Sequence, residues 1–129
     1  MEYGITLRLS TPFADTVERV RGALKEQGFG VLTEIDVQAT MRAKLGEEME
    51  DYLILGACNP ALAHRALGVD RRIGLLLPCN VVIRSEDGRT VIEALDPEVM
   101  VRITGREELA PVADEAAVRL RAALETLRS

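Results

Sequence analysis

Two short stretches carry the residue types best suited to chemistry. "ILGACNPALA" begins at residue 54 and "GLLLPCNVVI" at residue 74, and they hold the only two cysteines of the chain, Cys58 and Cys79. Each cysteine directly precedes an asparagine, Asn59 or Asn80. Thiols bind soft metal ions, act as nucleophiles and take part in redox reactions, and amides orient ligands through hydrogen bonds. These four residues form the candidate ligand-binding site.

The position of Cys58 favours a reactive thiol. Asn59 is the expected cap and Pro60 the expected first residue of a helix, so Cys58 directly precedes a helix N-terminus. Unpaired N–H groups and the helix dipole favour negative charge there and raise thiol reactivity. His64, the only histidine, would lie about one turn into that helix and could complete a soft-metal or redox cluster. His64 or Lys44 could also serve a nucleophilic Cys58 as proton acceptor or charge partner.

A structural role explains the same residues. Free cysteine is often buried as a small apolar side chain, and asparagine before proline is a common helix cap. The chain has neither the C-x-x-C nor the H-x-x-x-H spacing. Three hypotheses stay open: a binding module for an apolar small molecule or a soft metal ion, a thiol-dependent enzyme or redox protein that uses Cys58, and a structural or interaction protein with both cysteines in the core. No cofactor is assigned.

Other candidate sites have simpler explanations. No G-x-G-x-x-G or Walker motif is present, so nucleotide binding has no support. The acidic stretch "GEEMED" at 46–51 is typical of a solvated loop, although it could hold a divalent cation. Asp36, Asp96 and Glu98 could supply acid–base chemistry, but Asp36 is expected to cap a helix and Asp96-Pro97 to form a turn. Met100 is expected to pack in the core.

Charge and hydropathy exclude several classes of partner. A formal charge of −5 repels a phosphate backbone, which argues against a nucleic-acid partner. The longest apolar run, near residues 73–83, is shorter than the roughly 18 residues that span a bilayer. The N-terminus lacks the basic and apolar regions of a signal peptide. We therefore expect a cytoplasmic protein with no membrane partner.

The alternation and spacing of apolar residues predict the elements that position the two cysteines. Strands are expected over 3–10, 29–37 and 51–58, and in two segments of 73–96 around a turn at 86–88. Helices are expected from a Thr11 cap with Pro12 in first position to Gly28, over 37–45 between Asp36 and Gly46, from Asn59 to Gly68, and over 109–127. A short helical or irregular segment is expected from Asp96 to Met100.

This order predicts a single α+β domain over residues 1–129. Two long amphipathic helices and about five strands, one pair of them a hairpin, favour a mainly antiparallel sheet with both long helices on one face. The length of the chain is that of one ordinary domain.

The stretches "LGACNPALAHRAL" and "GLLLPCNVVI", with "EIDVQATMRAKLG" before them and "VIEALDPEVM" after them, closely resemble the bacterial and archaeal domain-of-unknown-function family three hundred and two. The resemblance runs from the first helix to the last. It includes Asp36, Lys44, Cys58, Asn59, Pro60, Pro78, Cys79, Asn80, Asp96 and Pro97.

The resemblance implies a strand–helix–four strands–helix arrangement similar to the TATA-binding-protein saddle, with short helical insertions, and a tendency to form homodimers. It implies no activity. A likeness to the saddle does not bring DNA binding with it, because function depends on the site and this chain is acidic.

Overall fold

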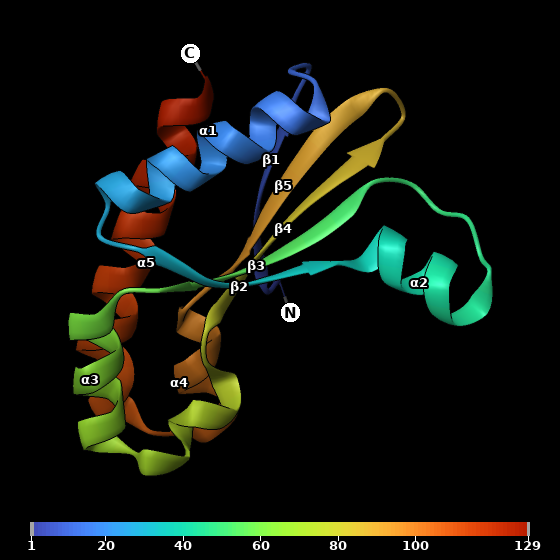
Figure 1. The fold of residues 1–129 in the computed structure, drawn as a ribbon. Helices are drawn as coiled ribbons and strands as arrows, with labels where there is room; N and C mark the ends of the chain where they lie inside the picture. Colours follow the sequence, from blue (N-terminus) through green and yellow to red (C-terminus); the bar gives the residue numbers. More distant parts are fainter. Residues whose placement is uncertain (1, 129) are drawn as a thin grey trace.

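A five-stranded antiparallel sheet packs on one face against two long helices in the computed structural model, which describes residues 2–128 (Figure 1). The sheet order is β1-β5-β4-β3-β2. The elements are β1 (Gly4–Leu9), α1 (Phe13–Glu26), β2 (Gly30–Asp36), α2 (Val37–Leu45), β3 (Tyr52–Cys58), α3 (Pro60–Val69), the 3₁₀ helix η1 (Arg71–Leu76), β4 (Cys79–Glu86), β5 (Arg89–Leu95), α4 (Glu98–Thr104), the 3₁₀ helix η2 (Glu107–Leu109), α5 (Ala110–Glu125) and the 3₁₀ helix η3 (Thr126–Arg128).

The predicted fold class is confirmed. The chain runs strand, helix, four strands, helix, with α2, α3 with η1, and α4 as short helical insertions. The hairpin between β4 and β5 turns at Asp87 and Gly88, whose φ angles are 50° and 76°. Such left-handed backbone suits the two-residue turn between right-twisted strands. None of the described helices is long and apolar enough to cross a membrane.

Two hydrophobic clusters share α5. Leu120 and Leu124 of α5 pack with α1 and the covered face of the sheet. Val112 and Ala116, earlier in the same helix, pack with α3, η1 and α4. The helix therefore sets the position of the α3–η1–α4 unit relative to the strands.

Two local predictions were wrong at the first long helix. The helix α1 begins at Phe13, and Pro12, with φ −56° and ψ 151°, stands at the cap without a side-chain bond. The Thr11 carbonyl instead accepts hydrogen bonds from the hydroxyls of Thr16 at 3.2 Å and Thr90 at 2.7 Å. Thr11 thus links the start of α1 to β5 and is not its cap.

The segment before β4 also differs from the prediction. The helix α3 continues through Gly68 to Val69, and the Asp70 carboxylate accepts from the Arg72 N–H at 2.9 Å, which starts η1. Residues 71–76, predicted in part as strand, therefore form a 3₁₀ helix that buries Ile73 in the second cluster. The strand β4 begins only after Pro78, which has no N–H to donate to a ladder.

A close approach between strands explains one glycine beside the cysteines. A Cβ built on Gly56 would collide with Thr33 Oγ1 and lie 2.8 Å from Pro78 Cγ. We expect Gly56→Ala to lower the free energy of unfolding by about 1–3 kcal/mol in urea denaturation, because the Pro78 ring cannot rotate away. Gly22→Ala, in α1 with open space around its Cβ, is the matched control and should raise stability by about 0.5–1 kcal/mol. Equal effects of the two substitutions would contradict this packing.

Candidate functional site

The sheet register brings the two cysteines to the same end of neighbouring strands. Cys58 is the last residue of β3, Cys79 is the first residue of β4, and Ala57 lies directly opposite Cys79. Because the strands are antiparallel, the end of one meets the start of the other. Two cysteines 21 positions apart in the chain therefore become neighbours.

The start of α3 is fixed as the sequence predicts. Asn59 has an extended backbone, with φ −99° and ψ 107°, and its Oδ1 accepts from the Leu62 N–H at 3.2 Å. Pro60 occupies the first turn. The Asn59 side chain also lies against the α1–β2 turn, where its Nδ2 would be 3.0 Å from a Cβ added to Gly28. The Asn59 side chain therefore contacts α3 through its oxygen and the α1–β2 turn through its nitrogen.

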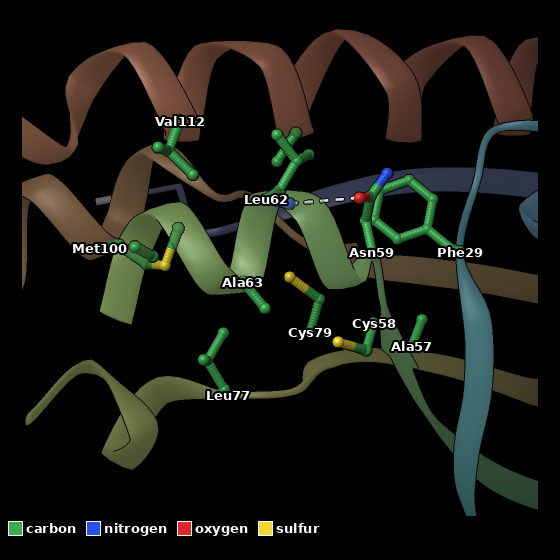
Figure 2. A pocket seen from close by; sticks show the side chains of 12 residues that line it. Phe29, Ala57, Cys58, Asn59, Leu62, Ala63, Leu77, Cys79, Met100 and Val112 are labelled. Atoms are coloured by element: carbon green, nitrogen blue, oxygen red, sulfur yellow. Dashed lines mark hydrogen bonds between the residues drawn. The ribbon is translucent and has the colours of Figure 1, made fainter. Parts of the chain in front are cut away.

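A small, mostly apolar cavity lies where β3, β4 and α3 meet (Figure 2). Its volume is about 30 Å³. A cavity of this size holds a single ion or one or two water molecules, whereas pockets for drug-sized ligands measure roughly 300–1,000 Å³. The lining residues are Phe29, Ala57, Cys58, Asn59, Leu62, Ala63, Ala66, Leu77, Cys79, Met100, Val112 and Ala116.

The two thiols differ in their surroundings. Both are free, Cys58 is partly exposed, and Cys79 is buried with 8% of its surface accessible. Burial, and then the neighbouring Cys58, raise the pKa of the Cys79 thiol to about 11. Cys79 is consequently a neutral thiol at neutral pH.

Charged residues outside the cavity link the elements that line it. Arg65 of α3 pairs with Glu115 of α5 at 3.0 Å, and Arg119 pairs with the same carboxylate at 3.2 Å. Arg119 also donates to the Gln27 carbonyl at 3.3 Å. Arg65, followed by Arg119, lowers the pKa of Glu115. These bonds join α3, α5 and the α1–β2 turn around the cavity.

Three of the four predicted site residues lie together, and the fourth lies elsewhere. Cys58, Asn59 and Cys79 line the cavity, but Asn80 is exposed and lines a separate groove on the opposite face of the sheet, with Tyr52 and Glu93. Successive strand residues point to opposite faces, so Cys79 and Asn80 cannot share one pocket. The sequence motif was interpreted as one site, and this geometry corrects that interpretation.

The proposed partners of the thiols are not at the cavity. His64 is exposed on α3 and Lys44 is exposed on α2, and neither lines the cavity. Within residues 2–128, no three His, Cys, Asp or Glu side chains are grouped to hold a metal ion. The predicted cluster of Cys58, Cys79 and His64 is therefore wrong in its third member.

The candidate acid–base residues have structural roles. Asp36 caps α2 by accepting from the Ala39 N–H at 2.9 Å, as predicted. Asp96 accepts from the Glu98 N–H at 3.0 Å at the start of α4. Glu98 lies beside Asp114, and their shared hydrogen bond, with burial, raises the pKa of Glu98.

Sequence reasoning missed the part of the cavity that α4 and α5 supply. Met100 was expected to pack in the core, and Val112 and Ala116 belong to the helix predicted over 109–127; all three are buried in the second cluster. Their apolar periodicity predicts that they are buried but not that they line a cavity with the two cysteines. That position depends on how α4 and α5 pack against α3.

Comparisons with known proteins agree with the fold. The family described as "Domain of unknown function DUF302" matches residues 5–127. The crystal structure of an uncharacterized conserved DUF302 protein from Bacillus stearothermophilus is similar, with a TM-score of 0.91 and 32% sequence identity over 97% of this chain and 98% of that one. A search of curated proteins finds no match to the chain.

The unequal burial of the thiols predicts unequal alkylation. In the reduced native protein, iodoacetamide should modify Cys58 rapidly and Cys79 only after guanidinium is added, because Cys79 is buried and protonated. Intact-mass spectrometry counts the adducts, and Cys58→Ser should abolish the fast phase while Cys79→Ser leaves it. Fast modification of both thiols, or loss of the fast phase in Cys79→Ser, would contradict the geometry.

Proposed function

The chain belongs to the DUF302 family, and from its cavity we propose that it is a small binding module that holds one soft monovalent metal ion between Cys58 and Cys79. One observation carries the proposal: the two thiols converge in a single cavity of about 30 Å³. Copper(I) is the natural candidate, since thiolate and thioether ligands select it.

The size of the cavity favours an ion over an organic ligand. A drug-sized molecule needs roughly ten times this volume or more. An apolar occupant would have to be no larger than about one or two water molecules. The alternative of an apolar small molecule, left open by the sequence, therefore has less support than a metal ion.

The ligand set favours a soft monovalent ion over zinc. Zinc in proteins takes three or four nitrogen, sulfur or oxygen ligands, and no such group exists within residues 2–128. Copper(I) is satisfied by two thiolates. Met100, whose side chain carries a thioether, also lines the cavity, on the far side of Ala63 from the two cysteines in the view of Figure 2.

Binding replaces both thiol protons by the ion. One M⁺ and two thiols give a bis-thiolate complex with one net negative charge and release two protons. The N-terminus of α3, directly after Cys58, favours a negative charge at this point. Assistance to Cys58 by His64 or Lys44 as proton acceptor or charge partner has weaker support, because both residues lie outside the cavity.

Proton release makes the affinity depend on pH. Because the pKa of Cys79 is about 11, binding at neutral pH must expel that proton, and metal affinity should rise with pH. The apparent Kd for copper(I) should fall about tenfold or more for each pH unit between pH 6 and 9, with one ion bound per chain. Competition with a bathocuproine chelator under anaerobic reducing conditions measures it, and silver(I) is a redox-inert second probe.

Variants inside and outside the cavity test whether the metal ion binds there. Cys58→Ser and Cys79→Ser should each lose tight binding, whereas Asn80→Ala, exposed on the other face of the sheet, should bind as the parent does. Unchanged affinity in Cys79→Ser, or a Kd independent of pH, would rule the proposal out.

We also propose that a second copy of the chain covers the open face of the sheet, opposite α1 and α5. An apolar row crosses β2, β3 and β4 there, since Ile35 lies opposite Ile54 and Ile54 opposite Val82. Ile35 is 48% exposed. Arg84 pairs with Glu93 at 2.8 Å on this face, so its central charges are already neutralised. An apolar patch of this kind suits a protein partner.

The oligomeric state tests this interface. Light scattering after size exclusion should give the mass of two chains for the parent and of one chain for Ile54→Lys. Val118→Lys, at a position 67% exposed on α5, is the control and should remain a dimer. A monomeric parent at all concentrations would contradict the proposal.

A further inference from the structure

We infer that Cys58 and Cys79 form a dithiol that reduces low-molecular-weight disulfides by thiol–disulfide exchange and becomes an intramolecular disulfide in doing so. This activity does not require a bound metal. One consequence of the activity does rest on the proposed function. The oxidised protein has no free thiols and therefore cannot hold the metal ion.

The sheet register places the two residues within reach of a disulfide. Cys79 lies opposite Ala57, so Cys58 is one position along the neighbouring strand. Opposed Cα atoms in an antiparallel pair lie about 4.5–5.5 Å apart, and one residue adds about 3.4 Å along the strand. The Cα atoms of Cys58 and Cys79 are therefore separated by about 6 Å, within the range of about 4.4–6.8 Å that a disulfide spans.

Both side chains face the same space. Each cysteine lines the cavity under α3, and Figure 2 shows both sulfur atoms there. Each thiol also lies near enough to influence the other, since Cys58 contributes to the raised pKa of Cys79. Cys58 is the last residue of β3, and it lines the cavity together with Cys79 although strict strand alternation would send it to the opposite face.

Exposure divides the two roles. Cys58 is partly exposed and directly precedes α3, so a dissolved disulfide can reach it. Cys79 is 8% exposed in a cavity too small for a second substrate molecule. Cys58 is therefore the attacking residue and Cys79 the resolving residue.

The reaction proceeds in two balanced steps. The Cys58 thiolate attacks one sulfur of the substrate disulfide, which forms a mixed disulfide and releases the first substrate thiolate, protonated by water. Cys79 Sγ then gives up its proton to solvent and attacks Cys58 Sγ, which releases the second substrate thiolate. Two protein thiols are oxidised to one disulfide, and one substrate disulfide is reduced to two thiols.

The second step should be the slower one. Cys79 is 8% exposed and lies inside the small cavity, so its access to the mixed disulfide at Cys58 is restricted. The mixed disulfide should therefore accumulate first and then disappear. This time course distinguishes an internal resolving thiol from a second external one.

The test uses oxidised glutathione and the reduced full chain with a metal chelator present. Intact-mass spectrometry should detect a transient species with one glutathione, followed by a species without adduct that no longer reacts with iodoacetamide after unfolding. Cys79→Ser should stop at the stable glutathione adduct, and Cys58→Ser should stay reduced. Peptide mapping of the oxidised parent without reductant should identify a Cys58–Cys79 cross-link, a readout that needs no variant.

Two results would overturn the inference. One is a parent that retains one or two glutathiones without forming the cross-link. The other is Cys58→Ser taking up glutathione as fast as Cys79→Ser. Because the chelator removes metal from this assay, and copper titration uses fully reduced protein, failure of the exchange and failure of the metal proposal are distinguishable.

Discussion

The packing of α5 against two hydrophobic clusters is the constraint on which the site depends. Leu120 and Leu124 pack on the sheet, and Val112 and Ala116 pack on the α3–α4 unit. Because α3 begins directly after β3 and is held against α5, the chain must turn at Asn59. Cys58, the last residue of β3, lines the cavity that it shares with Cys79. Without the contact between α3 and α5, Cys58 and Cys79 would no longer share a cavity.

Local signals in the sequence were sufficient for most elements. Asp36 and Asn59 were identified as caps from their residue type and position. A carboxylate or amide oxygen just before a helix typically accepts a hydrogen bond from a free N–H of the first turn, as both do here. The 71–76 segment was misassigned because a short apolar run does not distinguish a strand from a buried helical turn. What decides it is the Asp70 cap before the run and Pro78 after it.

The site was only partly predictable for a different reason. The Cys-Asn pairs identified three cavity residues, but the same adjacency placed Asn80 in the site, where strand alternation excludes it. His64 was the natural third ligand by type, and the helix carries it to the exposed side. A local sequence motif does not predict which residues of distant helices will line the same cavity. They depend on how α4 and α5 meet α3.

One physical cost links the two proposed activities. A thiolate at Cys79 would be a charge in an apolar cavity, and its pKa of about 11 expresses that cost. A disulfide removes the proton and leaves no charge, and a bound monovalent ion removes the proton while cancelling one of the two thiolate charges. The same cavity therefore suits both the metal-bound form and the disulfide form. The reduced cysteines can bind the ion, and the oxidised cysteines cannot.

Copper K-edge X-ray absorption of the reduced, copper(I)-loaded protein tests the central claim most directly. Two sulfur neighbours per copper at one ion per chain are predicted, because Cys58 and Cys79 face one cavity with room for a single ion. A third, longer sulfur contact would come from Met100, which also lines the cavity. Nitrogen or oxygen neighbours in place of either thiolate would show that the two cysteines do not act as one site.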